Sequence, residues 1–237
     1  MTEKLKIAED ETQAAGGGRW PAGEDPVKRQ QILEGARRVF LKMGFDAASM
    51  NDVTREAGVS KGTLYVYFAN KEELFSAMIE SQRAAFLASI RTALNQPDDM
   101  EAGLYDFAVS FITHVTDEKV IDAMRTVLGV RDRMPQLCQG FLKGPENLRT
   151  VLCDFLTRQV AAGTLAIDDL ELAAGQFLDL SSGSYFKLRL FGTMEQPPSQ
   201  AEIDRVARGA IRVFLAAYGR RQAATMEPAL QSASRKA

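Results

Sequence analysis

The sequence is poor in the side chains that build metal sites, redox centres and acid–base catalysts. Its 237 residues include only two cysteines, Cys138 and Cys153, and one histidine, His114. Neither cysteine has another Cys or His at metal-ligand spacing, so we expect no metal site and no cofactor. Both cysteines are expected to be small buried hydrophobic side chains, with a redox-sensing pair as the alternative. A glycine-rich phosphate loop is also missing, which makes an enzyme the weaker hypothesis.

Long apolar runs are absent as well. The longest purely apolar stretches fall far short of the roughly 20 residues that a membrane-spanning helix needs. The first ten residues contain no apolar segment followed by a cleavage site, so this start does not resemble a signal peptide. An apolar content of 46% and a charged content of 25% are typical of soluble globular proteins. We therefore expect a cytoplasmic protein without a membrane partner.

The net charge of −2 by itself argues weakly against a nucleic-acid-binding protein, but the charge is unevenly distributed. Between Pro26 and Lys71, eight basic residues stand against four acidic ones, so this segment carries +4 and the remainder carries −6. The basic residues are Lys28, Arg29, Arg37, Arg38, Lys42, Arg55, Lys61 and Lys71. A basic segment on an acidic body suits a protein whose one end meets phosphate groups.

Helical periodicity, without period-two strand patterns, predicts an all-α fold. Asp25 and Pro26 predict an N-cap and a first helical position, and Gly44 suits a left-handed residue that ends this helix. The apolar residues of the first helix share one face, which we expect to be buried: Ile32, Leu33, Ala36, Val39, Phe40 and Met43. Further helices are expected over residues 49–57, 60–68, 71–94, 100–115, 118–132, 135–163, 168–191 and 200–221. Gly144-Pro145 interrupts the helix over 135–163 and is expected to split or kink it.

These patterns divide the chain into four segments. Both ends are polar and lack helical periodicity, which favours disorder. The expected segments are a disordered arm at 1–25, a three-helix helix-turn-helix domain at 26–72, a larger helical domain at 73–221 that brings the total to about nine helices, and a flexible tail at 222–237.

The segment from Ser49 to Leu74 has the layout of a helix-turn-helix motif. Gly58 supplies a tight turn between two short helices. Ser49 and Asp52 have the spacing of a capping box, and Ser60 can cap the second helix. Apolar residues at helical spacing are expected to hold the motif together: Val53, Ala57, Val59, Leu64 and Phe68. Such a motif pushes the end of one helix into a groove of DNA.

The start of the second short helix offers groups that suit DNA. Gly62 has no side chain to hold the helix away, and Thr63 offers a hydroxyl and a methyl group to base edges. Helix N-termini favour phosphate, and tyrosine hydroxyls and mobile lysine charges can reach it. For the tyrosines the alternative is packing against the first helix. The expected DNA contacts are Ser49, Asn51, Ser60, Lys61, Gly62, Thr63, Tyr65, Val66, Tyr67 and Lys71.

The segment 32–74 resembles, without a gap, the DNA-binding domain of the tetracycline-repressor (TetR) family. The matching pieces are Ile32-Leu33, Gly44-Phe45, Ser49-Met50, Ala57-Gly58-Val59-Ser60-Lys61-Gly62-Thr63-Leu64-Tyr65, Tyr67-Phe68 and Lys71-Glu72-Glu73-Leu74. The remainder is similar to the family's AefR-like C-terminal subgroup in three shorter pieces: Met134-Pro135-Gln136-Leu137, Gly163-Thr164-Leu165, and Val213 to Gly219. The chain departs from the family pattern at Thr54 and Val66, which affects the expected base preference. The resemblance places a base-contacting residue at Asn51.

The resemblance also implies an inducer pocket in the C-terminal domain, whose occupation would change the separation of two DNA-binding heads. Sparse polar groups among apolar ones suit a small, mostly apolar ligand. The expected lining is Phe107, Phe111, His114, Met124, Leu128, Phe141, Phe155, Phe177, Ser181 and Tyr185. The alternative for each is ordinary core, and for His114 a core histidine with a satisfied partner.

A single head covers too few base pairs for useful affinity, which predicts a homodimer on a palindromic operator. The interface is expected to be a four-helix bundle from the last two long helices of each chain. Its candidates are Leu180, Leu188, Ile203, Val206, Ala210, Val213, Phe214 and Ala217. For the last helix, the alternative is the protomer's own core.

The sequence therefore predicts a ligand-responsive transcriptional regulator, with double-stranded DNA and a small-molecule effector as partners. A repressor is the first hypothesis. The alternatives are an activator, or a regulator that responds to a protein partner and has no small-molecule pocket. A central cavity in the C-terminal domain would favour the effector, whereas a filled core would favour the protein partner.

Overall fold

The structure, a computed structural model, describes residues 20–95, 99–137, 139 and 147–220. Most of the expected arm at 1–25 and all of the expected tail at 222–237 lie outside the described residues, as do Cys138 and Phe141. Within the described ranges, the only β-type pairing is an isolated bridge between Leu165 and Gly219. The expected all-α fold is confirmed.

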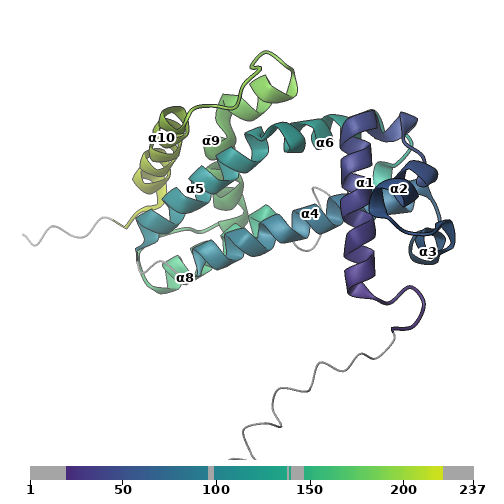
Figure 1. The fold of residues 1–237 in the computed structure, drawn as a ribbon. Coiled ribbons are helices and arrows are strands. Elements are labelled where there is room, and N and C mark those ends of the chain that lie inside the picture. Colours follow the sequence, from purple (N-terminus) through teal and green to yellow (C-terminus); the bar gives the residue numbers. More distant parts are fainter. Residues whose placement is uncertain (1–19, 96–98, 138, 140–146, 221–237) are drawn as a thin grey trace, which may run out of the picture. The chain divides into compact units, whose positions relative to one another are not determined.

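Figure 1 shows the helices in the order in which they follow one another along the chain. They are α1 (Pro26–Ala47), α2 (Met50–Ala57), α3 (Lys61–Tyr67), α4 (Lys71–Leu94), α5 (Met100–Thr116), α6 (Glu118–Gly129), α8 (Leu148–Ala161), α9 (Leu170–Leu190) and α10 (Gln200–Tyr218). The chain forms two compact units, Met1–Ser81 and Gln82–Ala237, so α4 begins in the first unit and ends in the second.

Local sequence signals set the start of α1. The Asp25 carboxylate accepts hydrogen bonds from the backbone N–H groups of Val27 and Lys28 at 2.9 and 3.1 Å. Pro26 occupies the first helical position, where its missing N–H costs nothing. Asp25 and Pro26 therefore have the capping roles that the sequence predicted.

The end of α1 folds back into an aromatic cluster. Gly44 has a φ of 75°, the left-handed conformation expected of it. After this change of direction, the ring of Phe45 is buried, and its centroid lies 5.8 Å from that of Phe40 and 5.0 Å from that of Phe75. Met43 was expected on the buried face, but it is 41% exposed because Phe45 fills that place. The other expected core positions of α1 are buried.

The turn between α2 and α3 is as the sequence predicted. Gly58 has φ 63° and ψ 37°, a left-handed conformation that glycine adopts without strain. Ser49 and Asp52 form both halves of a capping box at the start of α2. The residues expected to hold the motif together are buried, apart from half-buried Val59: Val53, Ala57, Leu64 and Phe68.

In the second unit, α5 packs against α9 and α10, and α8 packs against α9 (Figure 1). Aromatic rings run through this core. The ring centroids of Phe107 and Phe177 lie 5.9 Å apart, and those of Phe177 and Phe214 lie 5.0 Å apart in an edge-to-face arrangement. Each of the three side chains is fully buried. Burial of such a side chain contributes about 1.5–3 kcal/mol, so this cluster is a main source of stability for the unit.

The helix expected over 135–163 is interrupted, as its Gly144-Pro145 pair led us to expect. Asn147 has extended backbone and caps α8 through its side chain. Gly144-Pro145 itself lies outside the described residues. The helix expected over 168–191 differs from the prediction at Gly183, whose φ of 49° and ψ of −141° interrupt α9.

Cys153 behaves as a packing residue. Its side chain is half-buried, and its Sγ lies 3.5 Å from the carbonyl oxygen of Leu170, to which it donates. Burial raises the pKa of the Cys153 thiol to about 11, with Glu171 as a further contributor. A thiol is a weak nucleophile while it is protonated, so the raised pKa disfavours reaction at this cysteine.

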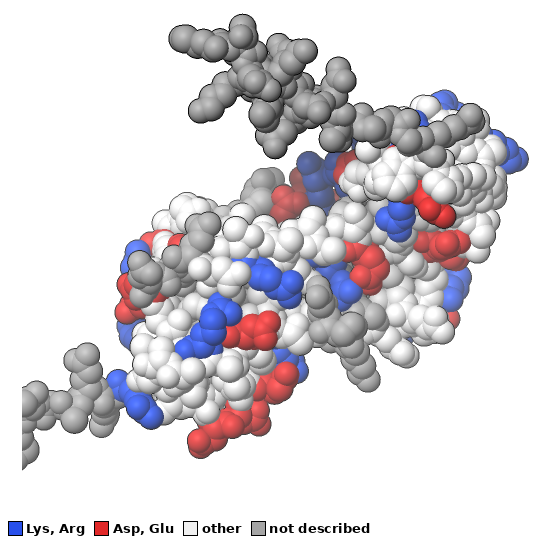
Figure 2. Space-filling view, turned by 90° about the horizontal axis from the view of Figure 1, so that it is seen from below, with Lys and Arg blue, Asp and Glu red and all other residues white. Residues whose placement is uncertain are grey.

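Charges of both signs are interspersed over the face of the molecule in Figure 2. Several of them are paired locally, as in the 3.1 Å contacts of Arg37 with Glu34 and of Arg125 with Asp122. Exposed pairs of this kind contribute little to stability. The interactions that position the helices must therefore be found among less exposed groups.

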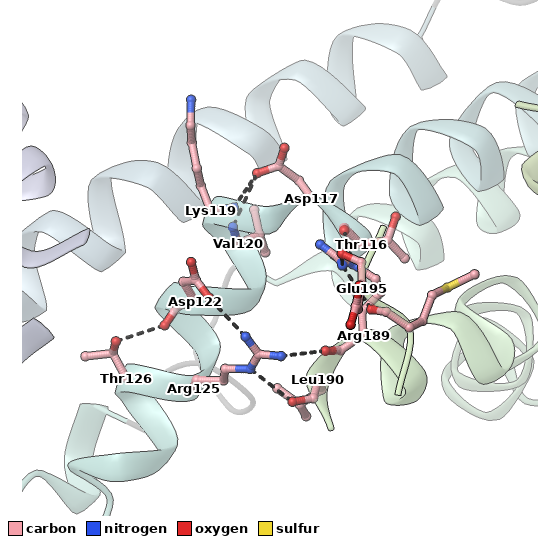
Figure 3. A network of polar contacts seen from close by, with 11 residues as sticks. Thr116, Asp117, Lys119, Val120, Asp122, Arg125, Thr126, Arg189, Leu190 and Glu195 are labelled. Carbon is pink, nitrogen blue, oxygen red and sulfur yellow. Dashed lines mark hydrogen bonds and ion pairs between the residues drawn. The ribbon is translucent and has the colours of Figure 1, made fainter. Parts of the chain in front are cut away.

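One such group is the guanidinium of Arg189 near the end of α9 (Figure 3). The residue is only 5% exposed, and its guanidinium donates hydrogen bonds to main-chain carbonyl oxygens. Its Nε donates to the carbonyl oxygen of Thr116 at 3.0 Å, and its Nη1 donates to Met194 at 3.0 Å and to Glu195. Thr116 is the last residue of α5, where unpaired carbonyls carry partial negative charge. Arg189 thus joins the ends of α5 and α9 to the segment that follows α9.

Arg125 of α6 acts in the same way on the end of α9 (Figure 3). Its Nη2 donates to the carbonyl oxygen of Arg189 at 2.8 Å, and its Nε donates to that of Leu190 at 3.1 Å. Its Nη1 bonds Asp122, which orients the side chain. Two arginines therefore hold α5, α6 and α9 together through main-chain carbonyls.

The close approach of α1 and α2 predicts a severe effect of Gly35→Ala. A Cβ atom on Gly35 would lie 2.6 Å from the Cβ of Ala57 and 2.8 Å from its Cα. Because backbone must move, we expect a loss of about 1–3 kcal/mol in the free energy of unfolding. Gly129→Ala is the matched control, since nothing lies within 4 Å of the added atom. Denaturant unfolding should separate the two variants, and equal midpoints would contradict the close contact.

The arginine network predicts that Arg189→Met destabilises the second unit. The substitution keeps the apolar stem but leaves the carbonyls of Thr116, Met194 and Glu195 without this donor, at an expected cost of about 2 kcal/mol or more. Arg212→Met, at an exposed position of α10, should change stability by less than about 0.5 kcal/mol. Thermal unfolding followed by circular dichroism measures both. A variant at position 189 as stable as the wild type would show that these bonds contribute nothing.

Candidate DNA-binding surface and effector region

The N-terminus of α3 is held in place by its own side chains. The Ser60 hydroxyl oxygen accepts a hydrogen bond from the backbone N–H of Thr63 at 3.0 Å and lies 2.8 Å from the Thr63 hydroxyl oxygen. Gly62 is exposed, and a Cβ built on it would meet only the Ser60 hydroxyl, at 3.8 Å. The first turn of α3 therefore presents bare backbone and a fixed threonine to whatever approaches it.

The outer face of α3 carries exposed side chains at the expected positions. Tyr65 is 44% exposed and Val66 is 53% exposed, whereas Leu64, on the inner face of α3, is fully buried. Lys61 is exposed, and its ammonium nitrogen lies 5.8 Å from the centre of the Tyr65 ring. This face offers a cation, a phenol and an apolar group beside one another.

At the N-terminus of α2, the capping box occupies the groups expected to bind phosphate. The Ser49 hydroxyl accepts from the Asp52 N–H at 3.2 Å and donates to the Asp52 carboxylate at 2.5 Å. The hydrogen bond from Ser49 lowers the pKa of the Asp52 carboxyl, which therefore keeps its negative charge. The Ser49 hydroxyl proton is thus already committed, while the Asn51 side chain stays exposed.

Tyr67 is tied to the start of α1. Its side chain is half-buried, and its hydroxyl donates to the carbonyl oxygen of Asp25 at 3.3 Å. The turn just before Asp25 also packs on α3, since a Cβ on Gly23 would lie 3.3 Å from the Val66 side chain. For the Tyr67 hydroxyl, the observed geometry matches packing on the first helix, which was the alternative to a phosphate contact.

The expectation of a mobile charge at Lys71 is wrong. Its ammonium nitrogen donates to the carbonyl oxygens of Phe45, Asp46 and Ala48 at 2.8, 3.3 and 3.0 Å. No sequence pattern indicates this contact, because the three acceptors are main-chain atoms more than twenty residues away.

The residues expected to line an effector pocket differ widely in burial. Phe107, Phe155 and Phe177 are fully buried in the core, and the Ser181 hydroxyl donates to the Phe177 carbonyl at 2.7 Å. Leu128, by contrast, is about half exposed. Phe111 and Met124 are half-buried, and Phe141 lies outside the described residues. The alternative of ordinary core fits the three phenylalanines.

A depression of about 820 Å³ is found elsewhere, as an open hollow between α5 and α10. It has none of the expected pocket residues. Its lining combines charged and apolar groups from Asp99, Glu101, Ala102, Tyr105, Arg208, Ile211, Arg212, Leu215 and Ala216. The Tyr105 hydroxyl donates to the Asp204 carboxylate, which also accepts from Arg208 at 3.2 Å. Two polar groups of the hollow, Tyr105 and Arg208, are therefore already paired.

The ring of His114 stacks on a neighbouring aromatic ring. Its ring lies parallel to that of Phe86, with an interplanar angle of 6° and a centroid separation of 3.5 Å. Burial lowers the pKa of His114, so the imidazole is neutral at pH 7. Tyr185, another expected pocket residue, accepts a hydrogen bond from Arg205 at 3.1 Å. Both polar side chains thus have partners without a ligand.

The candidates for the dimer interface divide into two groups. Ile203, Ala210 and Phe214 are buried in the core of their own protomer, so for these three the expected interface role is wrong. Helix α10 also carries apolar residues on a second face, which the protomer itself does not cover. Leu188, Val213 and Ala217 are exposed, and Leu180 and Val206 are half-buried. Phe191 directly follows α9, three residues after Leu188, and is 80% exposed, so it extends this set. It was not among the candidates because it lies at the very end of the helix expected over 168–191.

The described residues hold no cluster of His, Cys, Asp or Glu suited to a metal ion. Among the helices of the described ranges, none combines the length and apolarity of a bilayer-spanning segment.

Comparison with known proteins places both units in families. Residues 32–78 match the family described as bacterial regulatory proteins, tetR family. Residues 102–220, half of the chain, match the AefR-like transcriptional repressor, C-terminal domain. Both resemblances expected from the sequence are confirmed.

Individual relatives agree with this assignment. The HTH-type transcriptional regulator YfiR of Bacillus subtilis is 47% identical over 59 residues, which is 24% of this chain and 29% of YfiR. A TetR-family regulator from Mesorhizobium loti is 29% identical with a TM-score of 0.75, covering 81% of this chain and 97% of that one. The flavonoid-responsive regulator FrrA is 32% identical with a TM-score of 0.65, covering 82% of this chain and 98% of that one. The chain belongs to the TetR family of bacterial transcriptional regulators and has an AefR-like C-terminal domain.

Proposed function

We propose that the protein is a ligand-responsive repressor that binds a palindromic operator as a homodimer. The observation that carries the proposal is the first turn of α3, where an exposed Gly62 and a fixed Thr63 sit beside an exposed lysine. A helix end of this kind can approach base edges closely, which is what direct readout in the major groove requires. Family membership supplies the regulatory context.

The contacts to DNA are assigned by chemistry. Lys61 and Tyr65 bind phosphate, while Thr63 and Val66 offer methyl groups to thymine. The backbone of Gly62 and the free backbone N–H groups at the start of α3, next to Ser60, face the sugar–phosphate backbone of the DNA. Asn51, exposed at the start of α2, reads a base edge. Ser49, Tyr67 and Lys71 support the surface, since their donors are engaged within the protein.

The homodimer forms through the open faces of α9 and α10. Leu188, Phe191 and Val213 are exposed apolar side chains on these two helices. A four-helix bundle with a second copy would bury them and bring two α3 helices onto successive major grooves, about 34 Å apart.

The effector is a small, mostly apolar molecule that enters the aromatic core of the second unit. FrrA, which covers 82% of this chain, is described as flavonoid-responsive, which supports a planar aromatic compound as the first class to test. Because Phe107, Phe155 and Phe177 fill the described core, the ligand must select a conformation in which these rings separate.

A second candidate function is control by a protein partner, and the filled core favours it. In that case the regulator keeps its operator and dimer, but no small molecule changes its DNA affinity. An activator remains the alternative to a repressor, and reporter expression with and without the protein distinguishes them.

Operator binding is tested with DNA recovered by genomic footprinting. We expect Lys61→Ala to weaken binding to operator and random DNA alike, and to reduce the magnitude of the salt slope of log K by about 0.9. Thr63→Ala should instead reduce the preference for operator by about 1–3 kcal/mol and leave the slope unchanged. Lys119→Ala and Thr157→Ala are exposed controls in the second unit. Fluorescence anisotropy over a salt series measures all four, and unchanged binding in both α3 variants would exclude α3 as the recognition helix.

The effector is tested by a thermal-shift screen that begins with flavonoids. A ligand that binds only the native protein raises the melting temperature, by an amount equivalent to about 2.7 kcal/mol at one hundred times its dissociation constant. The same compound should release the operator in the anisotropy assay. Stabilisation without release, or release by a protein extract alone, would favour the second candidate function.

A further inference from the structure

The Lys71 ammonium is saturated by the protein. An ammonium group has three N–H donors, and this one has three carbonyl acceptors at 2.8, 3.0 and 3.3 Å. Its nitrogen also lies 4.5 Å from the centre of the Phe45 ring, a distance suited to a cation–π interaction. A phosphate could bind this ammonium only if at least one of these bonds were broken. The geometry therefore opposes a direct DNA contact.

The three carbonyls lie at one point of the chain. Those of Phe45 and Asp46 follow the left-handed Gly44, and that of Ala48 directly precedes Ser49, the N-cap of α2. Carbonyls at the end of a helix carry partial negative charge, which attracts a cation. Lys71 thus binds the connection between α1 and α2.

The connection between α1 and α2 also makes an apolar contact with α4. Phe75 lies one helical turn after Lys71, and its ring centroid is 5.0 Å from that of Phe45 and 5.1 Å from that of Phe40. The start of α4 is itself fixed, because the Glu73 N–H donates to the Asn70 side chain at 2.8 Å. A polar contact and an apolar one therefore join the first turn of α4 to the backbone that leads into α2.

We propose that Lys71 is a positioning residue for DNA recognition. Its three hydrogen bonds join the first turn of α4 to the connection that leads into the start of α2, where Asn51 lies. The proposal rests on the proposed function, since it assigns Lys71 a part in operator binding without a phosphate contact.

The salt dependence of binding separates positioning from phosphate contact. Lys71→Met keeps the alkyl stem and removes the three hydrogen bonds. We expect it to weaken operator binding by at least about tenfold, to weaken random DNA much less, and to leave the salt slope as in the wild type. A phosphate contact would instead weaken both DNAs and reduce the slope by about 0.9. Lys61→Met is the matched variant, at an exposed lysine, and should show the second pattern.

Lys71→Arg provides the second variant and keeps the charge. A planar guanidinium binds phosphate well but cannot converge on three carbonyls as an ammonium does. We expect operator affinity to stay low in Lys71→Arg, with the wild-type slope. Restoration of wild-type affinity by arginine, or a reduced slope in Lys71→Met, would overturn the proposal.

Two checks keep the outcomes distinct. Circular dichroism at the assay temperature establishes that both variants are folded, and if Lys71→Met is not, the arginine variant decides alone. A wild-type protein that prefers no footprinted sequence over random DNA would refute the proposed function. If the wild-type protein prefers such a sequence and the Lys71 variants bind it with the same affinity as the wild type, only the positioning role is refuted.

Discussion

A helix of seven residues cannot persist alone in water, and the DNA-binding unit is built around that constraint. Helix α3 has one fully buried side chain within its bounds, Leu64, and is followed at once by the buried Phe68. Nucleation of so short a helix is unfavourable, so its form depends on packing and on its cap. The Ser60 cap, the hydrogen bond from Tyr67 to Asp25 and the close approach of α1 to α2 all help to hold these two turns of helix in place.

The requirement explains why residues that look suited to DNA are partly used for support. A surface that meets DNA must keep its shape before binding, because ordering it on contact would reduce affinity. Ser49, Tyr67 and Lys71 each place a donor on an acceptor of the protein itself. Lys61, Gly62 and Tyr65 remain exposed. In the proposed DNA-binding surface, some polar side chains are thus exposed while others are engaged within the protein.

Local signals predicted the local structure well. The caps at Asp25, Ser49 and Ser60 and the left-handed turns at Gly44 and Gly58 depend on neighbours within a few residues, so the sequence alone identifies them. The Lys71 contact could not be predicted, since its acceptors are carbonyls, which every residue has. Helix α10 shows a second limit. Its periodicity marks Ile203 and Val213 as apolar alike, but only the packed fold shows that Ile203 lies inside the protomer and Val213 outside.

The C-terminal unit shows the same limit at its aromatic residues. Spacing alone cannot distinguish a ring that lines a cavity from a ring that fills a core, and here Phe107 and Phe177 contact each other. His114 drew attention as a lone histidine, and its ring stacks on that of a neighbouring phenylalanine. Its partner, Phe86, is on α4, which ends in the same unit.

The ties made by Arg125 and Arg189 have a consequence for sequence variation. Their acceptors are main-chain carbonyls at Thr116, Leu190, Met194 and Glu195, together with that of Arg189. A carbonyl is present whatever side chain a position carries, and neither it nor a guanidinium titrates in the physiological range. Beside the core packing of α5 on α9, the hydrogen-bonded joint between α5, α6 and α9 therefore depends on the side chains of Arg125 and Arg189, and on no hydrogen-bonding side chain at its other acceptor positions. Such a joint can persist while the surfaces around it diverge, and its strength stays the same across the pH range of a cell.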